Sequence, residues 1–432
     1  CLNRIEQFEP KLGAFQAVYA EDAREAALAA EKAYRSGHRI GPFHGIPFAL
    51  KDIIDIEGRI TTGGSKVMSE RISPATATIA RRLLAAGGIL LGKTKTVEVA
   101  MGGWGTNEHM GTPWNPWDLQ IPRTPGGSSS GSGVSVAAGL AGCAVGTDTG
   151  GSVRIPSSWC GIVGLKTSEG LLPTDGIIPL SHTLDTPGPM ARCVDDVSLM
   201  FEVMAGRHPI DTDLDLERGQ GLFGAREAGI KGLRVGVLSE DEREGINAEI
   251  LSLYENAIGV LRSLGAEISV FQMPMRFEDM QDATGSIIYS EGYYHHGEMY
   301  EDKDATVDPH VRPRILGGRD ISARDYLAAL FKRRNDQGEF LNGMRGYTGF
   351  VTPTAAYPAI PLDQVDQKTT PARFTRATNY LGLCGLSVPM GLTSSGLPGG
   401  LQILARQNEE AKAIRVGASF EAAQGGIGHP DL

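Results

Sequence analysis

The chain has few cysteines and no pattern among them. Five occur in 432 residues, and they are odd in number, widely spaced and without a Cys-x-x-Cys pair. Neither a disulfide framework nor a zinc site is indicated, so we expect a reducing compartment and no bound metal. The sequence also lacks an apolar run of the roughly 18 residues that span a bilayer and any Asn-x-Ser/Thr sequon. We therefore expect a cytoplasmic protein without a membrane partner.

Positive charge is also in short supply. The 41 Lys and Arg residues are outnumbered by 51 Asp and Glu residues, which gives a formal net charge of −10. Nucleic acids and anionic membranes attract basic surfaces, so neither partner is expected. The 41% hydrophobic content is ordinary for a globular protein of this length. The chain opens inside a pattern typical of an amphipathic helix, with Leu2, Ile5 and Phe8, which is consistent with residues missing upstream.

Glycine is abundant, with 57 residues, and it gathers with serine in two clusters. The second cluster is Gly-Thr-Asp-Thr-Gly-Gly-Ser, at 146–152. Its consecutive glycines free the backbone to turn N–H groups toward a developing negative charge. The hydroxyl of Ser152 stands beside those N–H groups. We interpret Ser152 as a nucleophile.

The first cluster, Gly-Gly-Ser-Ser-Ser at 126–130, is expected to deliver at least one hydroxyl to the same place. Gly/Ser-rich stretches are usually flexible linkers. Here the two clusters flank a segment of small apolar residues, in which 134–140 predicts a buried helix and 141–146 a short strand. Because the serines then stand at the ends of regular elements, the pattern favours an active site over a linker.

Lys51 is a candidate general base. It ends the apolar run 46–50, and the run 53–56 continues the apolar character after it. A lysine at the end of a strand is more often a solvated surface residue. Burial among apolar residues favours the neutral form of a lysine, which is the form that a general base needs.

Two motif matches point to other functions, and we reject both. Residues 87–94 fit the G-x-x-x-x-G-K-[ST] phosphate loop, but the intervening Gly-Ile-Leu-Leu belongs in a sheet rather than around phosphates. Residues 127–131 fit the G-x-S-x-G nucleophile elbow, but Arg-Thr-Pro-Gly precedes them where that elbow needs a buried strand. No histidine stands in a recognisable catalytic frame.

Six motifs carry a family resemblance. They are GPFHGIPFALKDIIDIEG, TPWNPWD, PGGSSSGSGVSVAAGLAG, GTDTGGSVRIPSSWCGIVGLK, the turn LDTPGPMAR, and SSGLPGGLQILAR near the end. On these motifs, which are spread over nearly the whole chain, the sequence resembles the amidase signature family. The resemblance implies an amidohydrolase that uses a Ser–cis-Ser–Lys triad and no cofactor.

The resemblance assigns roles by motif position. The nucleophile falls on Ser152, the lysine on Lys51, and the bridging serine, which follows a cis peptide in the family, on Ser128. The oxyanion hole would be formed by backbone N–H groups of residues at the second cluster, namely Thr149, Gly150, Gly151 and Ser152. The expected contacts to a small-molecule amide substrate are Ala100, Met101, Gly102 and Gly127.

Two positions depart from the family pattern. Ser130 stands where the family usually has glycine, and it adds a hydroxyl near the triad. Leu-Cys-Gly at 383–385 replaces a stretch that usually carries Pro-Ala, which puts the local turn at Cys384 in doubt. Neither departure affects a triad position.

The fold class expected is α/β, a three-layer α/β/α sandwich with a mixed central β-sheet. Residues 1–432 should form a single amidase domain, with a signature core at about 40–205, a helical part at about 273–346 and a return to the sheet at 347–432. The resemblance implies that the helical part is a variable insertion over the substrate channel. Locally, we expect Pro10 to end the first helix and Ser73 with Pro74 to cap a helix through Ala86.

The predicted activity is hydrolysis of the carboxamide bond of a small substrate, aryl amides included. A carbamate (urethane) or ester hydrolase would use the same triad, and an amidotransferase A-type subunit would share the motifs but work in a complex. A non-catalytic binding protein would keep the fold and lose the triad, and the intact triad positions argue against it. The resemblance leaves open a homodimer.

Overall fold

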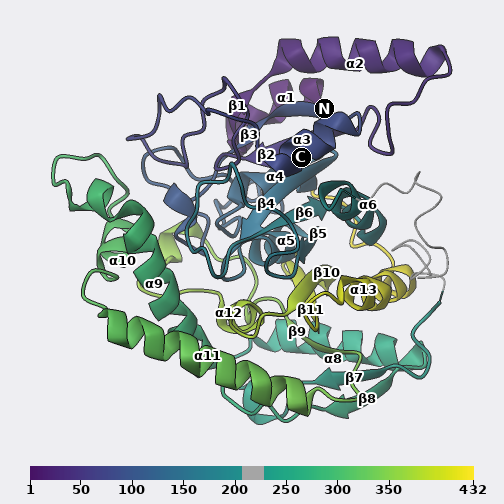
Figure 1. The fold of residues 1–432 in the computed structure, drawn as a ribbon. Helices are drawn as coiled ribbons and strands as arrows, with labels where there is room; N and C mark the ends of the chain where they lie inside the picture. Colours follow the sequence, from purple (N-terminus) through teal and green to yellow (C-terminus); the bar gives the residue numbers. More distant parts are fainter. Residues whose placement is uncertain (207–227) are drawn as a thin grey trace.

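The computed structural model of the protein describes residues 1–206 and 228–432. An 11-stranded sheet runs through it, from β1 at one edge to β8 at the other (Figure 1). In order across the sheet, the strands are β1 (Phe15–Val18), β3 (Ile89–Thr94), β2 (Pro47–Lys51), β4 (Cys143–Asp148), β6 (Thr186–Ala191), β5 (Val163–Lys166), β10 (Cys384–Leu392), β11 (Pro398–Ala405), β9 (Gly349–Pro353), β7 (Arg234–Val237) and β8 (Glu267–Val270).

The sheet is mixed. Strand β2 runs parallel to both of its neighbours, β3 and β4, and β7 runs parallel to β8 and β9. The remaining neighbouring pairs are antiparallel. The mixed sheet between helical layers confirms the predicted α/β class.

Helices pack on the sheet and on one another. Four helices form a row: α3 (Thr78–Ala85) contacts α6 (Val194–Met204), α6 contacts α13 (Glu410–Gln424), and α13 contacts α8 (Ala248–Ser263). Helices α6 and α13 lie side by side in Figure 1. The helices α4 (Ser130–Ala137) and α5 (Arg154–Cys160) pack together on the central strands, and α12 (Arg373–Tyr380) contacts β10.

The other described α-helices lie further from the centre of the sheet. They are α1 (Leu2–Leu12), α2 (Ala20–Arg35), α9 (Phe277–Glu301), α10 (Arg312–Leu316) and α11 (Ala323–Gly343). Residues 273–346 hold the last three of these and no strand. Helix α9 contacts α10, α11 and α12, so this helical part reaches back to the sheet through α12.

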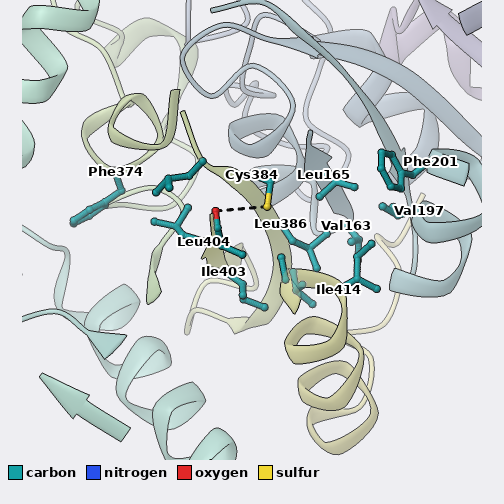
Figure 2. Close-up of a cluster of buried hydrophobic side chains, with 14 of the residues drawn as sticks. Val163, Leu165, Val197, Phe201, Phe374, Cys384, Leu386, Ile403, Leu404 and Ile414 are labelled. Carbon is teal, nitrogen blue, oxygen red and sulfur yellow. Dashed lines mark hydrogen bonds between the residues drawn. The ribbon is translucent and has the colours of Figure 1, made fainter. Parts of the chain in front are cut away.

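The strands at the centre of the sheet are buried in an apolar core. Figure 2 shows part of it, where Leu165 of β5, Leu386 of β10 and Ile403 of β11 lie near Ile414 of α13. Cys384 belongs to this cluster as the first residue of β10, and its thiol donates to the carbonyl of Ala405 at 3.6 Å. The turn lies before Cys384, at residues 381–382, and Cys384 and Gly385 belong to a regular strand. The departure from the family pattern therefore does not disrupt the sheet.

The topology brings two of the predicted site segments together. Strands β2 and β4 are parallel neighbours, in register at Leu50 and Val145. Their carboxyl ends therefore lie next to each other on the same side of the sheet, and ligands commonly bind at the carboxyl ends of strands in α/β proteins. Lys51 ends β2, and β4 leads directly into the loop that holds Ser152.

Two expected helix ends are wrong. Pro10 lies inside α1, which continues to Leu12 and ends at Gly13 in the left-handed conformation. Helix α3 begins at Thr78 rather than after Ser73, because Asp175 accepts hydrogen bonds from the backbone N–H and hydroxyl of Thr78, at 3.2 and 2.8 Å. The cap comes from a residue that is distant in the sequence.

The expected LDTPGPMAR turn is also wrong, because six of its nine residues, Thr186–Ala191, form β6. Strand β6 pairs along its length with β4, with Pro187 opposite Thr147 and Pro189 opposite Val145. Its pairing with β5 includes only Met190 and Ala191. The prolines therefore lie where β6 has a ladder on one side only, which explains how a strand so rich in proline fits inside the sheet.

Candidate active site

Lys51 is completely buried at the end of β2. Its amine donates to the hydroxyl of Ser128 at 2.7 Å and to the hydroxyl of Thr147 at 2.9 Å. Burial lowers the pKa of Lys51 to about 7, although the charges of Asp185 and Asp148 act in the opposite direction. The surroundings of this amine therefore favour its neutral form far more than those of an ordinary lysine.

Ser128 lies just before α4, and the Gly127–Ser128 peptide bond is cis. Its carbonyl accepts hydrogen bonds from the hydroxyl of Thr96 at 2.9 Å and from the N–H of Val97 at 3.2 Å. These bonds anchor the backbone of Ser128 while its side chain reaches Lys51.

The other two serines of the first cluster point to different partners. The hydroxyl of Ser129 donates to the carbonyl of Thr147 and accepts from the N–H of the same residue, each at 3.2 Å. The hydroxyl of Ser130 donates to the carbonyl of Lys95 at 3.3 Å. The hydroxyl that departs from the family pattern is therefore bonded to the backbone and makes no bond to Lys51.

Ser152 lies in the loop between β4 and α5 and is nearly buried, with 8% of its surface exposed. Its hydroxyl makes no hydrogen bond to any of the described residues, Ser128 included, and the residue lines a cavity. The two clusters are joined through the backbone, because the N–H of Ser129 donates to the carbonyl of Ser152 at 3.3 Å.

We call residues 149–152 the oxyanion loop. The N–H of Gly151 donates to the carboxylate of Asp148 at 2.8 Å, so this group is not available to a substrate. The N–H groups of Thr149, Gly150 and Ser152 have no acceptor within the described parts of the chain. Three of the four N–H groups predicted to form the oxyanion hole therefore make no hydrogen bond within the described residues.

Glycine is needed at position 151. Its φ is +128°, and a Cβ atom there would lie 2.2 Å from the hydroxyl oxygen of Thr375. That hydroxyl donates to the carbonyl of Gly150 at 2.8 Å. The bond fixes the orientation of the peptide after Gly150, and a side chain at Gly151 would break the arrangement.

A buried ion pair holds the carboxylate that binds the oxyanion loop at Gly151. Arg154 donates from Nε and Nη2 to the carboxylate of Asp148, at 2.9 and 2.8 Å, and both side chains are fully buried. Burial alone would raise the pKa of Asp148, but the charge of Arg154 and its hydrogen bonds hold that pKa well below its usual range. Asp148 is therefore ionised over the whole physiological pH range.

Two residues near Lys51 were not singled out from the sequence. Thr147 accepts from the amine, and Asp185 accepts from the hydroxyl of Thr149 and from two backbone N–H groups, those of Leu180 and Ser181. Burial raises the pKa of Asp185 despite these bonds. Neither residue type has a diagnostic spacing, and only the fold places them here.

The active-site cavity has a volume of about 370 Å³ and is open to Ser152. All four predicted substrate contacts line it, namely Ala100, Met101, Gly102 and Gly127. Its other wall comes from α9, α10, α12 and the loop before α12. The sequence predicted a helical insertion at about 273–346 over the substrate channel, but it assigned no substrate contact to the individual residues of this wall. The polar residues of that wall include Gln281, Asp282, Tyr289, Arg314, Gln367 and Arg376.

Residues 89–94 of the rejected phosphate-loop match form strand β3. Lys93 is buried there, where its amine donates to the carbonyl of Ile54 and to the hydroxyl of Thr61, the latter at 2.7 Å. The amine of Lys93 therefore bonds to other residues of the protein and does not face a ligand. Within the described residues, no group of three His, Cys, Asp or Glu side chains is placed to hold a metal ion.

A model of the family named Amidase matches residues 1–414. The chain belongs to the amidase signature family. The protein is 35% identical to the 2-amino-5-chloromuconic acid deaminase of Comamonas testosteroni, over all of this chain and 94% of the deaminase. It is 33% identical to the A-type subunit of the glutamyl-tRNA(Gln) amidotransferase of Alkaliphilus metalliredigens, over 98% of this chain and 92% of that relative.

Solved structures agree with the sequence relatives. The fold of this amidase signature protein matches a crystal structure of an amidase with a TM-score of 0.87 at 30% identity, covering 98% of this chain and 94% of that one. The protein is thus an amidohydrolase that acts on C–N bonds other than peptide bonds. No helix in residues 1–206 or 228–432 is both long and apolar enough to cross a bilayer.

Proposed function

We propose that the protein is an amidase that hydrolyses the carboxamide bond of a small substrate through an acyl-enzyme on Ser152. The observation that supports it most is the hydrogen bond between Lys51 and Ser128, made by a buried lysine with a lowered pKa beside the nucleophile's loop. A neutral amine at this position can accept a proton, which is what nucleophilic attack by a serine requires.

The proposed first step is acylation. Ser152 attacks the carbonyl carbon while its proton passes to Ser128, and the proton of Ser128 passes to Lys51. The oxygen of the tetrahedral intermediate accepts hydrogen bonds from the free N–H groups of Thr149, Gly150 and Ser152. The relay then returns a proton to the nitrogen, the C–N bond breaks, and the amine leaves.

The second step is hydrolysis of the Ser152 ester by water, with the same relay taking the proton of the water molecule. The two serine hydroxyls make no direct bond in the free enzyme, and such catalytic hydrogen bonds often tighten only when substrate binds. No step needs a metal or an organic cofactor.

Within this mechanism, the leaving group of the substrate determines whether an amide, a carbamate or an ester is hydrolysed. Carbamates and esters would follow the same steps, because only the atom bonded to the acyl carbon differs. A panel of aryl amides, aliphatic amides, carbamates and esters, assayed with purified protein, tests the proposal. We expect amides to be cleaved and Ser152→Ala to abolish turnover. Turnover that persists in Ser152→Ala would overturn the assignment of the nucleophile.

A second candidate is an amidotransferase A-type subunit, which the likeness to relatives of that name over nearly the whole chain favours. Such a protein would need partner chains, whereas an amidase is active alone. Hydrolysis of small amides by the purified chain, without added partners, supports the amidase. Activity that appears only after addition of partner chains would support the second candidate.

A further inference from the structure

Two arginines line the active-site cavity without a carboxylate partner. Arg314 on α10 and Arg376 on α12 are both half-buried in the cavity wall. Neither forms an ion pair with a carboxylate of the described residues. Arg314 donates instead to the carbonyl of Met101 at 3.0 Å and to Gln367, and Arg376 donates to the carbonyl of Gln281 at 3.1 Å.

Positive charge is therefore concentrated in this cavity. Its charged lining residues are three cations, Arg314, Arg376 and the exposed Lys368, and one carboxylate, the exposed Asp282. The whole chain has a net charge of −10, so the cavity differs in sign from the protein as a whole. Burial lowers the pKa of both arginines, while the charge of Asp308 acts in the opposite direction on Arg314 and that of Asp282 on Arg376. Charged groups in such places are normally paired.

Arg376 lies against the oxyanion loop. A Cβ atom at Gly150 would lie 3.2 Å from its Cγ and 3.6 Å from its Nε, and a Cβ atom at Gly285 of α9 would lie 3.3 Å from its Nη1. The side chain therefore fits between α9 and the loop where the scissile carbonyl would bind. The glycine at each position leaves room for it.

Arg314 approaches the cavity from another side. A Cβ atom at Gly102 would lie 3.1 Å from its Nη1, and the same nitrogen donates to the carbonyl of Met101. Arg314 thus touches the segment expected to contact substrate. Its bonds to Gln367 hold the guanidinium in place before any ligand arrives.

We propose that the substrate carries a carboxylate in addition to its scissile carboxamide, and that Arg314 and Arg376 bind this carboxylate. The proposal rests on the proposed function and narrows its substrate to amides of dicarboxylic acids and related carboxylated amides. Guanidinium groups match carboxylates in geometry and charge, and such charge-assisted bonds are stronger than neutral ones. A carboxylate here would form the direct ion pair that no carboxylate of the described residues makes with either arginine.

Matched substrates test the proposal. Succinamate, glutaramate and adipamate are compared with butyramide, valeramide and hexanamide, in which a methyl group replaces the carboxylate. We expect at least one carboxylated amide to exceed its neutral partner by roughly 100-fold in kcat/KM, since a site built to bind a charged group rejects an analogue that lacks it. Equal values within each pair would overturn the proposal while leaving the amidase function intact.

Variants then assign the preference to the arginines. Arg376→Gln and Arg314→Gln should each bring the ratio of the paired kcat/KM values toward one, mainly through KM, and Arg376→Lys should retain part of it. The matched control is Arg334→Gln, an exposed arginine of α11 outside the cavity, which should leave the ratio unchanged. An unchanged ratio in both Gln variants would overturn the assignment.

A binding experiment separates this proposal from the proposed function. Succinate, glutarate and adipate are titrated into the wild-type enzyme by calorimetry, together with the Arg376→Gln variant. Binding to the wild type that is lost in the variant supports the anion site, even if no amide of the panel is cleaved and the amidase proposal fails. Absence of binding by all three dicarboxylates, combined with no carboxylate preference in turnover, would overturn the anion site.

Discussion

The amine of Lys51 is buried, so water solvates its positive charge poorly. The side chain is fully buried, and burial lowers its pKa to about 7, while Asp185 and Asp148 act to raise it. An ordinary lysine, with a pKa near 10.4, stays protonated at neutral pH and accepts no proton. The hydrogen bond from this amine to Ser128 therefore joins a potential base to a hydroxyl.

The pH dependence of the reaction follows from the lowered pKa of Lys51. Because the base works only when deprotonated, kcat/KM should fall as pH drops below about 7 and level off on the alkaline side. The rate at which a fluorophosphonate labels Ser152 should follow the same curve. A labelling rate that stays flat between roughly pH 6 and 9, where an ordinary lysine stays protonated, would contradict Lys51 as the base.

The three serines of the first cluster should respond differently to substitution. Ser128→Ala removes the only one of these hydroxyls bonded to Lys51, so we expect kcat to fall on the order of 10³-fold or more. Ser130→Ala, which loses a bond to the carbonyl of Lys95, serves as the matched control and should cost far less. A larger loss of kcat in Ser129→Ala than in Ser128→Ala would contradict the relay.

Individual site residues differ in how far the sequence predicts them. Glycine runs and flanking apolar residues suffice to single out Ser152 and Lys51, because those signals are local. Choosing Ser128 over its neighbours needed the family resemblance, since three adjacent hydroxyls look alike in sequence. Arg314 and Arg376 could not be found, because a single arginine on a helix usually indicates a solvated surface.

Among the elements, the parallel pair β2 and β4 sets the geometry of the candidate site. Their apolar residues predict buried strands. The strand expected at 141–146 corresponds to β4, and the apolar run at 46–50 that ends at Lys51 corresponds to β2. Strand β6 was missed because its two prolines favour a turn, and only its neighbours in the sheet override that preference. The start of α3 was missed because its cap, Asp175, comes from a distant loop.

The cap of α3 gives a prediction at the scale of the element. Asp175→Ala removes the acceptor for the backbone N–H and hydroxyl of Thr78, so the free energy of unfolding should fall by about 1 kcal/mol. Urea denaturation measures the change, with Glu298→Ala on the exposed side of α9 as the control. Equal stability of Asp175→Ala and wild type would mean that solvent satisfies these groups equally well.

Across the whole molecule, the ion pair of Asp148 and Arg154 links distant parts of the chain. Arg154 also donates to the side chains of Asn379 in α12 and Gln402 in β11, and to the carbonyl of Thr375. The signature segment and the last quarter of the chain are thus joined beneath the oxyanion loop. Motifs predict each segment separately, but a contact between residues more than 200 positions apart is visible only in the fold.

Asp148→Asn should therefore destabilise the whole protein. The variant leaves Arg154 buried without its counter-ion, which typically costs about 3–5 kcal/mol in the free energy of unfolding. The exposed pair of Glu31 and Arg35 provides the control, since Glu31→Gln should change the stability little. Urea denaturation at pH 7 measures both differences.

The same variant should respond to pH in a way that identifies the carboxylate. The pKa of Asp148 is lowered in the folded protein, so its stabilising contribution is complete above the ordinary aspartate pKa of about 4 and is lost as pH falls below that value toward the folded pKa. Asparagine does not titrate. The gap in stability between wild type and Asp148→Asn should therefore be constant from pH 7 to pH 5 and narrow below pH 4. A gap of the same size at pH 3 would mean that the variant loses packing or hydrogen bonds rather than the charge that pairs with Arg154.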